Sequence, residues 1–284
     1  MTDVGEPPGP ARPADPPAAG SRWAGELAFA VETTAAAGAV LMERYERLER
    51  IDHKSATDVV TEADHLSEAL VIAAIRARYP GDAILAEESG AHAARESRPV
   101  NGRTWVIDPL DGTVNYANGL PVFCVSIGFV VDGVPMAGAV LDPTRGETFA
   151  ATADGPATLN GRPIRASAKA RLADSVISLS LSGRSVVSRA RAIRKEVRAA
   201  RSMGSASLAL AYAGNGRFDA FIQESSLSLW DIAAAGLVAE RAGATVTAFG
   251  GGPWYEPLKA TRTIGMIAAP APFHARLLDL ANRR

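Results

Sequence analysis

The chain has 284 residues, of which 47% are hydrophobic and 21% are charged, and its formal net charge is -1. This is a globular composition with ample apolar material for a core, in one large domain or two small ones. The charge balance gives no bulk electrostatic reason to bind nucleic acid or an anionic membrane, and the single cysteine excludes a disulfide framework and a cysteine-rich zinc site.

The first 20 residues differ in composition from the rest of the chain. They contain six prolines and three glycines and almost no large apolar side chains. Such a segment cannot bury enough surface to offset its ordering entropy, so residues 1–20 are predicted to be a disordered tail and residues 21–284 one folded domain. No secretory signal and no run of about 20 apolar residues is present, so a cytoplasmic setting without membrane association is expected.

Hydrophobic periodicity predicts the elements in chain order. Helices are expected over residues 23–48, 64–79, 185–200, 205–213 and 231–242 and at the C-terminus. Strands are expected at 83–86, 104–107, 122–131, 134–141, 147–153, 176–179, 218–223, 245–248 and 263–268. Asp132-Gly133 separates two of these strands and predicts a hairpin. Helices and mostly antiparallel strands alternate throughout, which predicts an α+β fold.

Two carboxylates follow the predicted strand at 104–107. Asp108 ends the apolar run, and Asp111 stands three residues later, after Pro109 and before Gly112. Burying two unpaired carboxylates on one turn is costly unless a cation neutralises them. Oxygen ligands suit a hard ion such as Mg²⁺ or Mn²⁺. A surface turn explains the same residues without a metal.

Three further acidic segments have equally simple explanations when each is taken alone. Glu87 and the residue after it follow the strand at 83–86 and could form a solvated loop. Thr61 and Asp64 precede a predicted helix, which Thr61 could cap. Asp231 lies in the first turn of another predicted helix, where an acid is favourable. The occurrence of all four elements in this order is not explained by capping and turns.

That combination resembles the inositol monophosphatase family of metal-dependent sugar and cyclitol phosphatases. The family pattern is an EE pair, then D-P-x-D-G-T, then W-D before a small-residue helix. The chain matches it at Glu87-Glu88-Ser89, at 108–115 and at 230–236, and also matches the upstream D-x-V-T-x-x-D at 58–64. The family's R-x-x-G-[ST]-A-A-x stretch is matched at 201–208, with Ser207 in place of the second alanine. The likeness runs from about residue 23 to the end of the chain.

The resemblance implies a layered α/β/α/β/α sandwich, a homodimer, and a site that binds two or three Mg²⁺ ions, for which Mn²⁺ could substitute. By the same resemblance the metal ligands are Glu87, Asp108, Asp111, Asp231 and the Leu110 carbonyl. Catalytic roles fall to Glu87, Thr113 and Asp64, the last two orienting or deprotonating the attacking water. The implied substrate contacts are Gly112, Thr113, Gly204, Ser205, Ala206, Glu224 and Asp231.

The chemistry of phosphate esters agrees with this set of residues. Phosphate monoesters repel anionic nucleophiles, so their hydrolysis needs charge neutralisation and positioning more than covalent catalysis. Cations held by four carboxylates could neutralise the phosphate, lower the pKa of a water and stabilise the leaving oxygen. The resemblance therefore predicts a phosphoric monoester hydrolase acting on a small phosphorylated metabolite.

The substrate is less well determined than the reaction. The resemblance implies that Glu224, which occupies the position seven residues before Asp231 where the family has a glutamate that binds ring hydroxyls, accepts hydrogen bonds from such hydroxyls, and this favours inositol 1-phosphate or a related polyol phosphate. Ser226 replaces the glycine that the family usually has two residues later. Histidinol phosphate is the alternative, with fructose 1,6-bisphosphate and 3′-phosphoadenosine 5′-phosphate also open. A catalytically silent binding or regulatory relative is the alternative of another class. The basic run at positions 189, 191, 194, 195 and 198 is expected to be mostly a solvated helix face.

Overall fold

The computed structural model describes residues 20–47, 51–55, 58–89, 102–183, 186–257 and 263–283. All but the last residue of the tail predicted for residues 1–20 lies outside this part of the chain.

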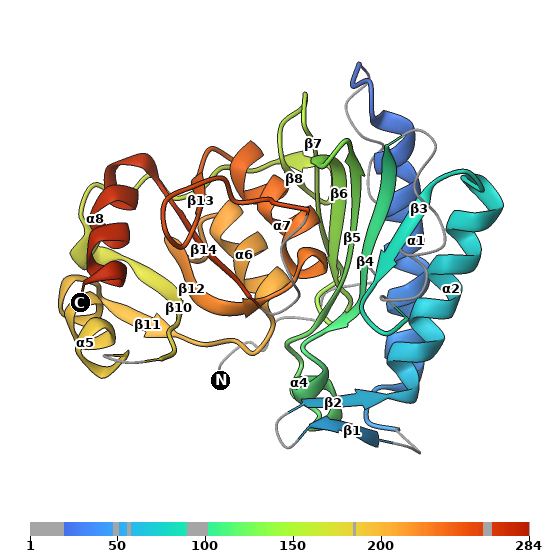
Figure 1. Ribbon diagram of the computed structural model, residues 1–284, viewed down its shortest axis with the longest axis horizontal. Helices are drawn as coiled ribbons and strands as arrows, with labels where there is room; N and C mark the ends of the chain where they lie inside the picture. The colour runs from blue at the N-terminus through green and yellow to red at the C-terminus, as the bar shows by residue number, and fades with distance from the viewer. Residues whose placement is uncertain are drawn as a thin grey trace, which may run out of the picture.

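The described elements form five layers, which Figure 1 shows from left to right. A large sheet has the strand order β3 (Ala83–Ala86), β4 (Arg103–Asp111), β5 (Cys124–Val131), β6 (Val134–Asp142), β7 (Glu147–Thr152), β8 (Thr158–Leu159) and β9 (Arg162–Pro163). A smaller sheet has the order β11 (Ala199–Arg201), β10 (Val176–Ser180), β12 (Ala220–Leu227), β14 (Ile264–Ala269) and β13 (Thr245–Ala248).

Three pairs of helices complete the layers. The outer face of the large sheet carries α1 (Ala24–Arg44) and α2 (Glu62–Arg78). Between the sheets lie α6 (Ala206–Gly214) and α7 (Leu229–Arg241), and beyond the small sheet lie α5 (Val186–Glu196) and α8 (Ala271–Asn282). The layered α/β/α/β/α sandwich expected from the sequence is confirmed.

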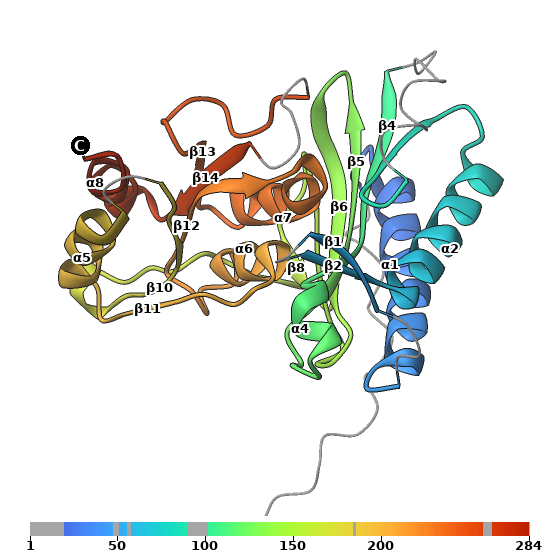
Figure 2. The ribbon, with the colours of Figure 1, turned by 60° about the horizontal axis from the view of Figure 1, so that its bottom comes forward.

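Most predicted elements are found within a few residues of their expected bounds, and the differences are short elements. The hairpin of β1 (Ile51–Ser55) and β2 (Asp58–Thr61) was not predicted, nor were α4 (Thr113–Ala117), the two-residue strands β8 and β9, and β11. Figure 2 shows that hairpin beside α4, which β2 contacts. Elements of three to five residues carry too few apolar positions for a periodicity to be seen.

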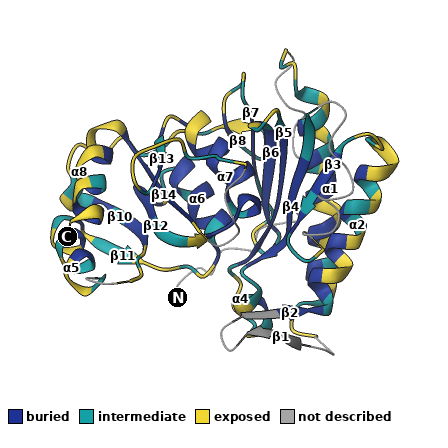
Figure 3. Ribbon diagram, viewed as in Figure 1, coloured by how far each residue is buried: buried dark blue, intermediate teal, exposed yellow. Residues whose placement is uncertain are grey.

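Helix α1 has the length and apolar composition that a membrane span would need. In this structure it packs against β5, β6 and α2, and residues such as Leu27, Ala30, Ala37 and Leu41 are buried there. The side away from the sheet keeps exposed residues, as Figure 3 shows. This is the burial pattern of a helix in a protein core.

Helix α7 lies unusually close to the large sheet. A Cβ added to Gly128 of β5 would lie 2.6 Å from the Cβ of Ala233, and one added to Gly138 of β6 would lie 2.7 Å from atoms of Ala234. The helix is buried along nearly its whole length, between the two sheets. Small residues on both partners therefore fix the position of the α7 N-terminus relative to β4 and β5.

Candidate active site

Strand β4 delivers two aspartates to one face of the large sheet because it contains a β-bulge. Asp108 pairs with Ser126 of β5 and Asp111 pairs with Cys124, so two residues of β4 lie opposite one of β5. On a regular strand, residues three apart point to opposite faces, and the extra residue restores a common direction. Both carboxylates therefore point toward α6 and α7.

Helix α7 supplies the third carboxylate. Ser228 caps the helix, and its backbone N–H donates to Oδ2 of Asp231 at 2.6 Å, which forms a capping box. The hydroxyl of Ser126 on β5 donates to the backbone carbonyl of Trp230 at 3.2 Å and ties this helix start to the sheet. The expected position of Asp231 in the first turn of a helix is confirmed, and the same side chain also lines the cavity described below.

The N-terminus of α6 holds Asp111. The Ser205 hydroxyl donates to Oδ2 at 2.6 Å, the Ser207 N–H donates to Oδ2 at 2.7 Å, and the Ala206 N–H donates to Oδ1 at 3.2 Å. The thiol of Cys124 also donates to Oδ2, at 3.6 Å. Donors at a helix start favour an anion, so this arrangement keeps Asp111 as an oriented carboxylate.

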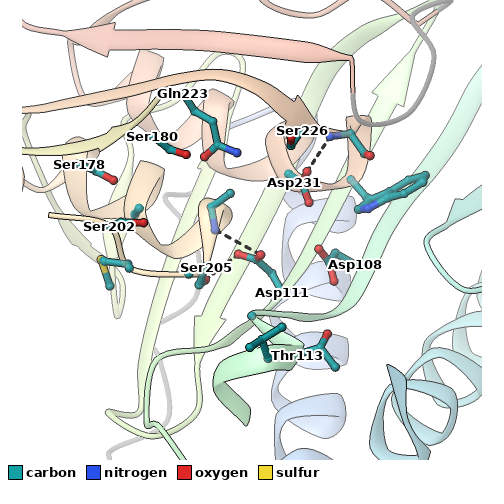
Figure 4. A pocket seen from close by; sticks show the side chains of 18 of the residues that line it. Asp108, Asp111, Thr113, Ser178, Ser180, Ser202, Ser205, Gln223, Ser226 and Asp231 are labelled. Carbon is teal, nitrogen blue, oxygen red and sulfur yellow. Dashed lines mark hydrogen bonds between the residues drawn. The ribbon is translucent and has the colours of Figure 1, made fainter. Parts of the chain in front are cut away.

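The three aspartates meet at one point. Each of Asp108, Asp111 and Asp231 offers a carboxylate oxygen, and these oxygens lie within 4.8 Å of one another. Figure 4 shows them converging at a cavity of about 260 Å³, which Glu87 also lines. Burial raises the pKa of Asp108 well above its ordinary value, and the charges of Glu87, Asp111 and Asp231 raise that pKa further.

This cluster fits a divalent cation. Asp108 is 1% exposed, and burial also raises the pKa of Asp231 and of Asp111. Carboxylate groups this close and this buried repel one another unless a proton or a cation lies between them. Several carboxylate oxygens without a nitrogen or sulfur ligand are the donor set that hard divalent ions prefer.

The loop that carries Glu87 is held by a residue that the sequence reasoning missed. Glu68 of α2 is 4% exposed, and its carboxylate accepts the N–H of Glu88 at 2.8 Å and that of Ser89 at 2.9 Å. On the same helix, the Ser67 hydroxyl donates to the Pro109 carbonyl in the β4 bulge at 2.9 Å. Helix α2 thus fixes both acidic loops. The sequence signals this role only in that Glu68 lies one helical turn after Asp64, on the face of the helix that is buried.

Asp64 and Thr113 form a second polar pair at the site. The Thr113 hydroxyl lies 3.1 Å from Oδ1 of Asp64 and 3.0 Å from the Leu110 carbonyl, and it can donate to either. Oδ2 of Asp64 accepts from both the N–H and the hydroxyl of Thr61 at 2.7 Å. Burial is the main reason why the pKa of Asp64 is raised, to about 6. The predicted cap by Thr61 is confirmed.

Most of the other predicted contact residues line the same cavity. They are Leu110, Gly112, Thr113, Gly204, Ser205 and Ala206. Two predicted site residues do not line it: Asp64 is buried behind Thr113, and Glu224 forms an ion pair with Arg189 of α5. Arg189, whose side chain is only 8% exposed, is the buried member of the arginine-rich run, whereas Arg191, Arg194, Lys195 and Arg198 are exposed, as expected of a mostly solvated helix face.

Comparison with known proteins places these features in a family. A model described as the inositol monophosphatase family matches residues 24–283. The Nus factor SuhB of Pseudomonas aeruginosa is 37% identical over 235 residues, which cover 79% of this chain and 86% of that protein. The inositol-1-monophosphatase of Synechocystis is 36% identical over 78% of each chain. A solved IMPase structure from Thermotoga maritima has a TM-score of 0.80 and 31% identity, and the match covers 91% of this chain and 97% of that one.

Proposed function

The chain belongs to the inositol monophosphatase family, and from this membership and the site we propose that it is a Mg²⁺-dependent phosphomonoesterase. The proposed substrate is a small polyol phosphate such as inositol 1-phosphate. In the reaction, the oxygen of a water attacks phosphorus, the ester P–O bond breaks, and the products are inorganic phosphate and the free alcohol.

One observation carries the proposal. Three carboxylate oxygens, two from the bulge of β4 and one from the start of α7, lie within 4.8 Å of one another, and the hydroxyl of Thr113, which lines the same cavity, lies 3.1 Å from the carboxylate of Asp64 behind it. A structural role alone would not explain why the fold gathers Asp108, Asp111 and Asp231 where burial opposes their charges.

The proposed ligands of the cations are Glu87, Asp108, Asp111 and Asp231 with the Leu110 carbonyl. When bound, divalent cations supply charge neutralisation for the phosphate and a lowered pKa for the attacking water. The backbone N–H groups of Gly112 and Thr113 and the segment 204–206 are proposed to hold the phosphate and the adjoining part of the substrate. These residues surround the cavity from the large sheet and from the start of α6.

Thr113 and Asp64 are proposed to orient the attacking water. The Thr113 hydroxyl has one proton, and donating it to Oδ1 of Asp64 leaves lone pairs on Oγ1 to accept a hydrogen bond from the water. An ionised Asp64 favours this direction of the hydrogen bond over donation to Leu110. Asp64 therefore has to be ionised for the pair to orient the attacking water.

A substrate panel tests the proposal. Phosphate release is measured with Mg²⁺ for inositol 1-phosphate, histidinol phosphate, fructose 1,6-bisphosphate and 3′-phosphoadenosine 5′-phosphate, with chelator and Li⁺ controls. We expect chelator-sensitive release that is fastest for inositol 1-phosphate. A folded protein that binds Mg²⁺ and releases phosphate from none of these esters would refute the proposal and favour a silent relative.

The proposal also includes a homodimer in the cytoplasm, as the family resemblance suggests, with residues 21–284 as the catalytic unit. Light scattering on the purified protein tests the dimer. A variant that begins at residue 21 tests whether residues 21–284 are the catalytic unit, because it should then keep the phosphatase activity of the full chain.

A further inference from the structure

Successive residues of β12 point to opposite sides of the small sheet. Phe221 and Gln223 line the cavity, whereas Ile222 belongs to the core beneath α5 and α8. Regular pairing of β12 ends at Gln223, after which its register with β14 shifts, so the position of Glu224 follows from its contacts rather than from alternation. Glu224 contacts Arg189 of α5, on the side of Ile222, and does not line the cavity. The sequence position expected to recognise the substrate therefore faces a helix instead.

Glu224 is held on that side by a bidentate ion pair. Nη1 of Arg189 donates to Oε1 and Nη2 donates to Oε2, each at 2.8 Å, and the Ser182 N–H donates to Oε2 at 2.8 Å. Partial burial opposes the charge, but these donors lower the pKa of Glu224. Planar two-point pairing of this kind is strong and directional.

Arg189 is itself fixed by the surrounding backbone. Its guanidinium also donates to the carbonyl oxygens of Ser182 at 2.8 Å and Ala281 at 3.0 Å. Turning Glu224 into the cavity would leave a buried guanidinium without its counter-charge, which is strongly unfavourable. Glu224 therefore joins α5, α8 and β12 rather than contacting a substrate.

The wall of the cavity opposite the aspartates is polar and uncharged. It is formed by β10, β12 and the segments beside them, and Figure 4 shows its side chains. Its polar members are Ser178, Ser180, Ser202 and Gln223. Among the described residues that line the cavity, none is lysine, arginine or histidine.

We propose that Gln223, not Glu224, is the specificity-determining residue for the alcohol half of the substrate; this rests on the proposed phosphatase function. The Gln223 amide combines an acceptor oxygen with N–H donors, one of which reaches the Ser225 carbonyl at 3.2 Å, so it can pair with neighbouring hydroxyls. A second phosphate on the substrate would meet no cation among the described residues of this wall. In the same part of the chain, an ammonium or imidazolium group would find no carboxylate lining the cavity beyond those of the acidic cluster. The wall selects a neutral polyhydroxyl group.

The test compares two substrates in three proteins. Steady-state kinetics with Mg²⁺ are measured for inositol 1-phosphate and for 4-nitrophenyl phosphate, which has no hydroxyl on its alcohol part. The proteins are wild type, Gln223→Leu, and the matched control Glu224→Gln at the next position. Thermal unfolding is recorded for all three.

Gln223→Leu should lower kcat/KM for inositol 1-phosphate about tenfold, chiefly through KM, because it removes a hydrogen-bonding side chain at nearly constant size. The same variant should change kcat/KM for 4-nitrophenyl phosphate less than about twofold. Glu224→Gln should leave the ratio between the substrates unchanged and lower Tm, because it weakens the pair with Arg189. Failure of that variant to fold would support the same structural role.

Three results would overturn the inference. A changed substrate ratio in Glu224→Gln, with Gln223→Leu like wild type, would return the recognition role to Glu224. Equal losses on both esters in Gln223→Leu would make Gln223 a structural residue. Both results leave the phosphatase function intact, whereas wild type without chelator-sensitive hydrolysis of either ester would overturn the function together with this inference.

Discussion

Replacing Asp108 with asparagine should stabilise the metal-free protein and remove most of its response to Mg²⁺. The side chain is 1% exposed, and its pKa is raised by burial and by three neighbouring acids. Asparagine has nearly the same shape, and its amide oxygen can still accept the Leu110 N–H, which donates to Oδ1 of Asp108 at 3.1 Å. The substitution therefore changes the charge of the cluster with little change in packing.

The size of the effect follows from the distance between the carboxylates. Two unit charges 4.8 Å apart repel by about 3.5 kcal/mol at an effective dielectric constant of about 20. The repulsion could be avoided by protonating one aspartate, but at pH 7 this costs about 4 kcal/mol for a carboxyl group of ordinary pKa. Asp108→Asn removes one such repulsion, which should add about 2–3 kcal/mol to the free energy of unfolding of the metal-free protein, or about 5–8 °C to its Tm.

The assay is thermal unfolding at pH 7 with chelator and with saturating Mg²⁺, together with phosphate release. Wild type should gain stability with Mg²⁺ by binding linkage. Asp108→Asn should start from a higher Tm, gain less than half as much with Mg²⁺, and lose at least about 100-fold in kcat, since loss of residues that merely support metal ligands costs 10–100-fold. Asp142→Asn is the matched control, because Asp142 is a buried aspartate outside the cavity that accepts the N–H groups of Thr144 and Arg145.

That control should lower Tm about equally with and without Mg²⁺. If Asp108→Asn also lowers Tm in chelator, the carboxylates are not under electrostatic strain in the metal-free protein. If it keeps the full Mg²⁺ shift and turnover, Asp108 does not bind the cation. Either result refutes the reasoning from charge and distance.

Three further predictions concern residues around the cluster. Asp64 has a folded pKa of about 6 against an ordinary 3.8, so its contribution to stability is present below pH 3.8 and is lost as the pH rises through 6. Because activity needs the ionised form of Asp64, kcat/KM should decrease as the pH is lowered below about 6. Asp64→Asn should abolish this pH dependence together with most of the activity. Glu68→Gln should raise the Mg²⁺ concentration for half-maximal activity about tenfold, since it loosens the loop of Glu87; an unchanged value would exclude the positioning role. Gly265→Ala should lower stability by at least about 2 kcal/mol, because its Cβ would lie 1.9 Å from a carbonyl oxygen of β12, whereas Gly250→Ala meets no atom within 4 Å and serves as the control in thermal unfolding.

The sequence predicted the site largely because its acids stand where strands end and helices begin. Strand β3 ends at Ala86, directly before Glu87, and Asp64 and Asp231 each occupy the third position of a capped helix. Those signals are local, and apolar runs and capping residues reveal them without knowledge of the tertiary fold. The α+β class followed in the same way from long elements with clear periodicity, whereas the order of the five layers was expected from the family resemblance.

Features that depend on register or on contacts between layers were not predictable. The bulge that turns Asp108 and Asp111 to one face has no reliable signal in the sequence, and neither has the use of the α6 start to hold Asp111. Glu224 was expected at the substrate from the family resemblance, which matches it by its position seven residues before Asp231, but that spacing does not say which face of β12 a residue takes. Its buried partner, Arg189, lies 35 positions earlier in the chain.

The acidic cluster is therefore a property of the packing between layers as much as of the motifs. Asp108 and Asp111 come from the large sheet, whereas Asp231 comes from a helix whose distance from that sheet is set by the contact of Gly128 with Ala233. A close-packed interface of this kind resists small displacements, so the three carboxylates are held at a fixed separation before any cation binds. The repulsion among them is offset by the cores on either side of α7. The stability of the interlayer core thus maintains an arrangement that the acids alone would not adopt, and it leaves the site preorganised for a divalent cation.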